Sequence, residues 1–491
     1  MKAPAVNRNS FPHLRILLLF LLLFLGQKEA APVLAQMSLE EFNARLEAME
    51  TENASLRAQI ESQSAPVSAP VSVPVPVSAP AADVPAETPS PIPDLEIQNQ
   101  LRESARKDQD SILLNMAEDD LEGELARYKN WQWSKDSFTF TPYVWFWLTG
   151  THETNQMFAG DYPLWVRNTD RSHTYFDMKA TRLGLNLTAP EVDSMPGVKL
   201  TGVLETDFQN TYVTENRPDI ELRKAYLQFQ NENFSFLFGQ TWELLSPLYP
   251  TVLNWGFGSG GGNFGFRRPQ VRFDRYFKRN DGRLALQTCV LSSNTNNFSA
   301  ADGTTYTGKM GRWPEFQLRL ERTFNEGTLW KSAMFAAGAK IGEKEYLTDS
   351  EEFHRTSWAF TADTKIRFTD RFFMLGEFYV GELLAVNCAA IMQDLNPRTR
   401  ENVGSTGGWL AFGWDLTPEV HYSVGASIDD VWNSSICEGM RAKNYFIFTN
   451  ISRDLTKAIN VGFEYEYYET EYFQLRNAHS HLFMICSMIK I

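Results

Sequence analysis

The sequence predicts an all-β fold: a 16-stranded antiparallel transmembrane β-barrel preceded by an N-terminal α-helical coiled-coil extension. Three observations support this prediction. Aromatic residues make up 13% of the 491 residues, although the average composition is polar. The chain begins with the pattern of an export signal. From Phe138 onward, segments that alternate apolar and polar residues are joined by connections that are long and short in turn, as in outer-membrane barrels.

Residues 1–35 have the order of a secretory signal peptide. Basic residues precede the short apolar run 16–25, and Val33, Leu34 and Ala35 form a plausible cleavage box. An N-terminal anchor helix is the alternative, but the run is shorter than the roughly 20 residues that a membrane-spanning helix needs. No long apolar run follows, so we predict an exported chain without a transmembrane helix.

A periplasmic coiled coil is predicted in residues 36–62. Apolar residues recur there at spacings of three and four, and the heptad register places Asn53 at an a position, where a buried Asn sets register and oligomer state. One amphipathic helix on the protein's own surface is the alternative, but the Pro/Ala/Val/Ser-rich linker 63–93 separates the segment from any core. The positions do not decide between dimer and trimer. The predicted oligomerisation residues are Leu39, Phe42, Leu46, Met49, Asn53, Leu56 and Ile60.

Residues 94–130 carry a charged helical pattern and are predicted to form a helical segment at the barrel mouth, where they could also plug it. The barrel is predicted to occupy 131–491. Its even-numbered connections are short and contain Asn, Asp and Gly, which suit tight turns. Its odd-numbered connections are long, which places both barrel ends on the periplasmic side. The strand candidates are 138–149, 173–188, 197–209, 221–230, 234–241, 268–277, 283–291, 313–323, 329–341, 354–368, 371–381, 408–415, 419–428, 442–452, 458–470 and 479–490.

Alternation within these strands predicts which side chains face the lumen. Along 313–323, Glu315 and Arg319 share one face, whereas Phe316 and Leu318 share the other. Charges among lipid tails cost several kcal/mol, so the polar faces are expected to point into water. A solvated face of a soluble sheet would alternate in the same way, but the export signal and the connections favour the barrel. The predicted pore-lining and constriction residues are Lys199, Glu205, Asp207, Glu243, Arg267, Arg268, Arg272, Arg319, Glu377 and Glu464.

Tryptophans along these strands suit the aromatic girdles that lie at the two membrane interfaces. The expected girdle residues are Trp145, Trp147, Trp358, Trp409 and Trp414.

The connection 242–267 is long and rich in Trp, Pro, Asn and Gly, and long loops are usually functional. We expect it to fold into the lumen and narrow it, with the glycines of 256–262 allowing sharp turns. These glycines also match G-x-G-x-x-G. A dinucleotide site needs a helix after that motif. An arginine-rich strand follows instead, so we reject that site.

Four arginines, Arg267, Arg268, Arg272 and Arg275, are expected to cluster where this connection rejoins the wall. Carboxylates expected across the lumen, such as Glu205, Asp207 and Glu243, would then create a transverse field that orients polar solutes. The alternative is that the arginines only hold the loop in place through hydrogen bonds to carboxylates. Both interpretations can hold together.

The remaining chemistry points away from catalysis and cofactors. Cys388 and Cys437 fall in two outside loops of an exported chain, so a disulfide between them is possible. His421 and Ser423 share a strand face, but two residues do not make a catalytic triad. The histidines show no metal-ligand spacing, so we predict no catalytic residues, no metal and no cofactor. A formal net charge of −14 disfavours nucleic acid as a partner.

Several stretches, 181–187, 197–208, 222–227, 238–242, 246–247 and 250–254, together resemble one family, the DcaP-like porins. The resemblance covers roughly Phe138 to the C-terminus. It implies a periplasmic coiled-coil extension, sixteen strands, a homotrimer and passage of small, often anionic, solutes. One departure concerns the last strand, since the chain ends in Ile491 where outer-membrane barrels usually end in an aromatic residue.

The sequence thus predicts an outer-membrane porin of a Gram-negative-type bacterium, not an enzyme, that passes small polar solutes by passive diffusion, with an N-terminal extension in the periplasm. Its expected partners are these solutes, outer-membrane lipid and two further copies of the chain. A different class of function is an envelope tether, in which the barrel is an anchor and the coiled coil and linker contact the peptidoglycan. A third is a barrel lipid hydrolase that uses Ser423.

Overall fold

The computed structural model describes residues 133–135, 138–160, 162–190, 194–209, 219–293, 305–327, 329–347 and 352–491. The predicted signal peptide, coiled coil, linker and helical segment at the barrel mouth lie outside these residues.

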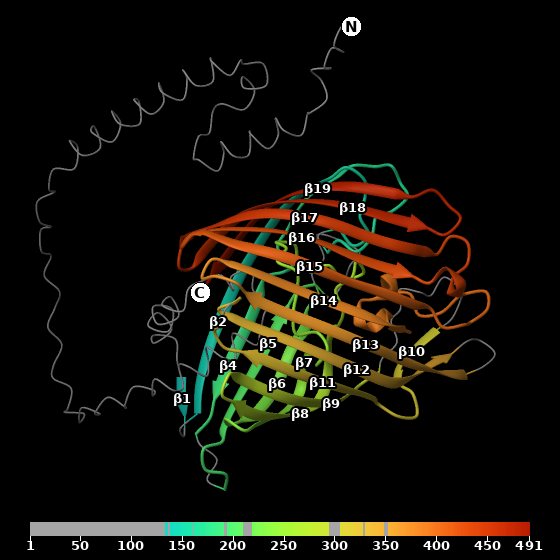
Figure 1. The fold of residues 1–491 in the computed structure, drawn as a ribbon. Coiled ribbons are helices and arrows are strands. Elements are labelled where there is room, and N and C mark those ends of the chain that lie inside the picture. The colour runs from blue at the N-terminus through green and yellow to red at the C-terminus, as the bar shows by residue number, and fades with distance from the viewer. Residues whose placement is uncertain are drawn as a thin grey trace, which may run out of the picture. The chain divides into compact units, whose positions relative to one another are not determined.

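The described strands form one antiparallel sheet that closes on itself (Figure 1). The closure is made by β19 and β2, where Cys486 lies opposite Thr149. A closed sheet leaves no edge with unpaired backbone groups. Strands in a lipid bilayer require such closure, because no water is present there to pair with an open edge. The strands are β1 (Trp133–Lys135), β2 (Phe138–Glu153), β3 (His173–Asp177), β4 (Arg182–Thr188), β5 (Lys199–Asp207), β6 (Glu221–Gln230), β7 (Phe234–Trp242), β8 (Arg267–Arg279), β9 (Gly282–Leu291), β10 (Thr305–Met310), β11 (Glu315–Phe324), β12 (Ser332–Leu347), β13 (Glu352–Arg367), β14 (Phe372–Glu382), β15 (Gly404–Thr417), β16 (Val420–Val431), β17 (Arg441–Thr456), β18 (Ile459–Tyr472) and β19 (Ala478–Lys490).

The wall of the barrel has sixteen strands. Two wall positions each hold two consecutive strands, because β3 and β4 both pair with β2, and β10 and β11 both pair with β12. The three-residue β1 pairs with the start of β2 and adds no wall position. The predicted 16-stranded antiparallel barrel is therefore confirmed.

The outer face of the wall is apolar and the inner face is polar, as the alternation predicts. In β11, Leu318 and Leu320 are 49% and 51% exposed, whereas Gln317 and Arg319 are 3% and 2% exposed. In β18, Glu464 is fully buried inside the barrel. This is the polarity expected of a wall placed in a bilayer, where lipid would solvate the apolar face and the inward charges would avoid the cost of meeting acyl chains.

Short connections gather at one end of the barrel and long ones at the other, the long-connection end (Figure 1). The turn after β6 is closed by the Asn231 side chain, whose Oδ1 accepts hydrogen bonds from the backbone N–H of Asn233 (2.8 Å) and Phe234 (3.0 Å). An Asn that binds its own backbone two residues on is a standard turn device. Gly282, with a φ of +142°, begins β9 after another short turn.

The helices in the described part of the chain are three short 3₁₀ turns. They are η4 (Ala385–Asn387), η5 (Ala390–Met392) and η6 (Asn433–Ser435). None of the described helices is long and apolar enough to cross a membrane.

Two of the expected girdle tryptophans point into the barrel. Trp147 is 1% exposed and packs against Trp255, and Trp409 is 4% exposed with its indole N–H bound to Asn263 Oδ1 at 3.0 Å. Both lie at strand positions whose side chains point inward. The aromatic type of a residue does not show to which face of the strand its side chain points. The girdle prediction is therefore wrong for these two residues.

Candidate functional site

Three long connections fold into the lumen and pack there as one apolar cluster. We call them the first lumen loop (154–160 and 162–166), the second lumen loop (243–266) and the third lumen loop (383–403). Each loop carries apolar side chains that are completely buried, for example Leu164 in the first loop and Leu253 in the second. The cluster continues onto inward-facing wall residues, among them Phe446.

Apolar composition explains why these loops leave the solvent. The second loop places Leu245, Leu248 and Val252 in the cluster, each 0% exposed. Burying one such side chain contributes about 1.5–3 kcal/mol relative to leaving it in water. Trp255 meets Trp147 of the wall edge-to-face with ring centroids 5.5 Å apart, an arrangement that aromatic pairs prefer.

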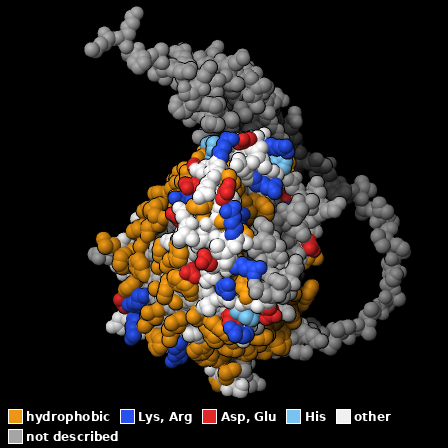
Figure 2. Space-filling view, turned by 90° about the vertical axis from the view of Figure 1, so that its right-hand side faces the viewer, with side chains coloured by type: hydrophobic (Ala, Val, Ile, Leu, Met, Phe, Trp, Pro, Cys, Tyr) orange, Lys and Arg blue, Asp and Glu red, His pale blue; other side chains and the backbone are white. Residues whose placement is uncertain are grey.

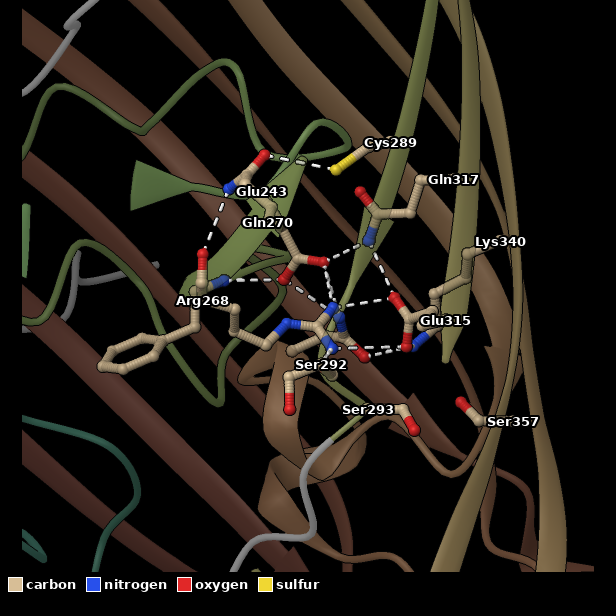
Figure 3. A network of polar contacts seen from close by, with 12 residues as sticks. Glu243, Arg268, Gln270, Cys289, Ser292, Ser293, Glu315, Gln317, Lys340 and Ser357 are labelled. Atoms are coloured by element: carbon tan, nitrogen blue, oxygen red, sulfur yellow. Dashed lines mark hydrogen bonds and ion pairs between the residues drawn. The ribbon is translucent and has the colours of Figure 1, made fainter. Parts of the chain in front are cut away.

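A network of charges fastens the second loop to the wall, and we call it the loop anchor (Figure 3). The guanidinium of Arg268 bridges Glu243 at the start of the loop and Glu315 of β11, with N–O distances of 2.5 and 2.7 Å. Lys340 of β12 pairs with Glu315 at 3.0 Å, and Gln317 donates to Glu243. Two cations and two carboxylates balance, so this buried network carries no net charge, which is the condition under which buried charges are tolerated.

The loop anchor also holds the third lumen loop through Asn387. The Asn387 side-chain amide donates to both carboxylate oxygens of Glu243 at 2.9 Å, and its oxygen accepts from Lys340. Sequence reasoning missed this loop. Its signal was present, because 383–392 is an almost continuous apolar run in a connection expected to face water.

Carboxylates of β18 hold the middle of the second lumen loop. Glu464 accepts hydrogen bonds from the backbone N–H of Leu253 (2.7 Å) and Asn254 (3.0 Å), and the Asn254 side chain donates to Glu466 at 2.6 Å. Asn450 of β17 also donates to Glu464, at 2.8 Å. Peptide N–H groups of an inward loop need such partners because water is excluded there. Glu464, predicted to line the pore, thus binds the loop.

Two arginines of the wall stack against the ring of Trp255 in the second lumen loop. Arg223 of β6 stacks 4.1 Å from the ring and Arg182 of β4 lies 4.5 Å from it. Arg223 also pairs with Glu205 and Asp207, both at 2.7 Å. Neither arginine was among the predicted site residues, although the alternation of β4 and β6 places both on the inner face.

Glycines let the second loop pass close to the wall. Gly262 has a φ of +124°, and a Cβ there would lie 2.5 Å from the backbone oxygens of Gly408 and Ile428. Gly265 has a φ of +108°, and a Cβ there would lie 2.2 Å from the Cβ of Ser246 in the same loop, so this glycine lets the loop pack against itself. These positions need glycine both for its backbone conformation and for the space.

The other predicted pore-lining residues do not form one group, and most of them have separate polar partners. Arg319 pairs with Asp363 at 2.6 Å, and Glu377 accepts from the Trp409 indole N–H at 3.2 Å. Arg272 pairs with Asp274 on its own strand at 2.9 Å. Lys199 is half-buried at the start of β5, and Arg267 pairs with Glu221 at 2.8 Å.

Two parts of the arginine hypothesis differ from the structure. Arg275 is exposed on the outer face with Val271 and Phe273, because it has their strand parity, so it does not join the other three. Arg268 and Glu243 are in direct contact and do not face each other across an open lumen. Their contacts are those of an arginine that holds the loop. A transverse field stays a prediction.

All four cysteines are free, so the possible Cys388–Cys437 disulfide is not formed. Cys388 lies in the third lumen loop at 4% exposure, and its carbonyl accepts a hydrogen bond from Gly260 at 2.7 Å. Burial raises the pKa of the Cys388 thiol to about 12. Cys437 lies half-buried in the connection after β16. The third loop folds inward and buries Cys388, whereas Cys437 belongs to a different connection and stays half-buried.

His421 is held between two carboxylates. Its Nδ1 lies 2.8 Å from Asp415 and its Nε2 lies 3.2 Å from Asp454. Both ring nitrogens are therefore engaged, and neither is left to accept a proton from Ser423. A separate group that the sequence did not single out, Glu345, Glu352 and His354, comes together at the rim with spacing that a metal ion could bridge.

No family model matches the chain, and no curated protein matches its sequence. Among solved structures, the outer membrane channel DcaP of Acinetobacter baumannii overlays with a TM-score of 0.60 at 16% identity, covering 73% of this chain and 99% of that chain. An anion-selective porin from Comamonas acidovorans gives 0.46 at 10% identity, covering 72% and 100%. OprB of Pseudomonas putida gives 0.48 at 9% identity, covering 76% and 97%; these two overlays are too loose to carry an inference. The chain therefore has the fold of the DcaP channel.

Proposed function

We propose that this protein is an outer-membrane porin that passes small polar solutes by passive diffusion through a lumen narrowed by the second and third lumen loops. The observation that carries the proposal is the polarity of the wall, apolar outside and charged inside, in a closed sheet of sixteen strands. Such a wall separates lipid from a hydrated interior.

The narrowing is supported by the loops' attachment at several points. The loop anchor holds their wall side, and Glu464 holds the middle of the second loop. A loop fixed at both places behaves as a permanent constriction, so solutes would be sorted by size and charge at its free surfaces. A preference for anions, which the family resemblance implies, is part of this proposal.

The test is single-channel conductance of the purified oligomer in a planar bilayer. Steps that arrive in threes would support the proposed homotrimer, and a reversal potential in a salt gradient would give the ion preference. Absence of conductance from folded, heat-modifiable protein would refute the porin and turn attention to the envelope tether. Nothing in the described part of the chain favours that tether, whose coiled coil and linker lie outside it.

The proposed location is the outer membrane, with the short connections and both barrel ends on the periplasmic side. The long-connection end then faces outward. Seen from that side, Lys, Arg, Asp and Glu side chains run in a band across the face, with hydrophobic side chains beside them (Figure 2). A charged mouth beside an apolar wall is the arrangement expected at a membrane–water boundary.

A further inference from the structure

One arginine of β8 faces the lipid side of the wall near the short-connection end. Val271, Phe273, Arg275 and Phe277 are alternate residues of β8, and all four side chains are exposed on the outer face. A cation on this face is costly at the centre of a bilayer and tolerated near its interfaces. We infer that Arg275 belongs to a binding site for one anionic phospholipid, with the headgroup phosphate at the arginine and an acyl chain in a groove beside Phe273.

The end of the barrel at which this arginine lies decides which lipid is available. β8 runs from the second lumen loop to the short turn at 280–281, and Arg275 lies near that turn. The inference shares one element with the proposed function, the orientation in which the short connections face the periplasm. The periplasmic leaflet of an outer membrane holds phospholipids. A phosphate diester is therefore the anion that this cation meets.

The Arg275 side chain reaches toward the periplasmic edge of the wall. Its Nη1 donates to the backbone carbonyl of Asn233 at 3.2 Å, and its guanidinium carbon lies 5.8 Å from the centre of the Phe277 ring. Asn233 belongs to the short turn between β6 and β7, so the charge lies at the level of the turns. Long cationic side chains extend in this way at membrane interfaces. Among the described residues the guanidinium has no carboxylate partner, so its other N–H groups can bind a phosphate.

Arg279 adds a second cation on the same face. It has the outward parity of Arg275 on β8, is exposed and forms no ion pair in the described part of the chain. Asp281 of the following turn accepts a hydrogen bond from Arg322 and is only partly available to Arg279. Glu232 of the neighbouring turn pairs with a lysine. The outer face at this end therefore carries an excess of positive charge, which attracts anionic lipid.

An apolar groove of about 710 Å³ lies on the outer face beside Arg275, toward the middle of the wall. Val271 and Phe273, the preceding outward residues of β8, line one side of it, and Phe360 of β13 lines the other. Ala339 of β12 is a small residue between these larger side chains. Such a depression gives an acyl chain contacts on several sides, which a flat wall does not. Headgroup cation and chain groove thus follow each other along the outward face of one strand.

The inference does not depend on conduction, and native mass spectrometry of the full-length oligomer in detergent tests it. The oligomer is titrated with phosphatidylglycerol and, separately, with phosphatidylcholine, which has the same phosphate diester but is neutral overall. We expect one phosphatidylglycerol per chain, and about fivefold or more weaker binding of phosphatidylcholine. Soluble glycerol 3-phosphate at the same concentration should not displace the lipid. Its displacement, or equal binding of the two lipids, overturns the inference.

Charge variants assign the headgroup to β8. Arg275→Gln should weaken phosphatidylglycerol binding about fivefold, and Arg275→Gln combined with Arg279→Gln about 25-fold, the ratios for one and two cations near a membrane surface. Arg453→Gln is the matched control, because Arg453 is an exposed, outward-facing arginine near the short-connection end of β17. Unchanged binding in the double variant, or an equal loss in Arg453→Gln, overturns the inference.

A groove variant assigns the acyl chain. Ala339→Phe fills the groove and should weaken phosphatidylglycerol binding at least about fourfold, the ratio for one displaced CH₂ group. Ala426→Phe is its control, an exposed, outward-facing alanine of β16 outside this groove. Unchanged binding in Ala339→Phe overturns the inference, and so does a changed oligomer mass, which would mean that a second copy covers the groove.

Conductance of the same variants separates this inference from the proposed function. All the substitutions lie on the outer face, so each variant that is heat-modifiable, and hence folded, should conduct like the wild type. Lost lipid specificity with intact conductance strikes the lipid site alone, whereas specific lipid binding without conductance supports the lipid site and strikes the porin alone.

Discussion

Removing the Glu243 side chain tests whether the loop anchor keeps the lumen narrow. The Glu243 carboxylate accepts hydrogen bonds from Arg268 and Gln317 of the wall, from Asn387 of the third lumen loop and from the backbone N–H of Phe266 (2.8 Å). Glu243→Ala leaves Arg268 with Glu315 and the Ser292 carbonyl, and it removes the side-chain link from Glu243 to Asn387 of the third loop. Breaking a buried ion pair by removing one partner costs about 3–5 kcal/mol.

That free energy converts into loop opening. At about 1.4 kcal/mol per factor of ten, the population of detached loops rises by at least roughly two orders of magnitude. The barrel wall keeps its own hydrogen bonds, so the protein should fold and remain heat-modifiable. In single-channel recordings, we expect brief excursions to higher conductance that are rare in the wild type and about 100-fold more frequent in Glu243→Ala.

Two comparisons sharpen this experiment. Glu232→Ala removes an exposed glutamate that forms a surface ion pair with Lys278 at 3.4 Å, which is worth at most about 1 kcal/mol, and should behave as the wild type. Asn387→Ala removes the side-chain link to Glu243 and the Asn387 acceptor of Lys340 but leaves the ion pairs of Arg268, and it should give the same excursions at lower frequency. If folded Glu243→Ala records like the wild type, the loop anchor does not hold a constriction and the reasoning is refuted.

Three further predictions follow from the lumen loops. Deletion of 256–262 should raise the steady conductance, because it shortens the second loop; an unchanged value would contradict the constriction. In the folded protein, a maleimide should label Cys437 and spare Cys388, whose burial raises the pKa of its thiol to about 12, and heat denaturation should expose both to labelling; labelling of Cys388 before heating would show that the third loop is not packed inside. Gly262→Ala should lower the temperature of heat modification much more than Gly160→Ala, which pays only the cost of positive φ, about 1–2 kcal/mol, since its Cβ meets nothing within 4 Å; equal shifts would mean that the loop does not press on the wall.

Strand number and facing were predictable from the sequence because both depend on local periodicity. Successive side chains of a strand point to opposite faces, so Glu315 and Arg319 could be placed inside from their neighbours alone. The same rule, applied strictly, would have placed Arg275 outside and Trp147 inside. Those two errors came from grouping residues by type, arginines with arginines and tryptophans with tryptophans, where strand parity decides.

The candidate site was predictable only in part. The second lumen loop was expected to turn inward because of its length and glycines, and Glu243, Arg268 and Glu464 were named from alternation and position. Their partners were not. Asn387 meets Glu243 across 144 residues of chain, and Glu464 meets Leu253 across 211. No pattern within one segment reports such contacts.

Local sequence patterns set the architecture of the barrel: a polar and an apolar face repeated along sixteen strands, with short turns and long connections in alternation. These features follow from interactions between residues close in the chain, and lipid and water sort the faces in the same way wherever the strands lie. The tertiary structure alone decided what fills the barrel. Three loops find one another inside a closed wall, where buried carboxylates and arginines are stable only in mutual contact, and that contact exists only after the sheet has closed.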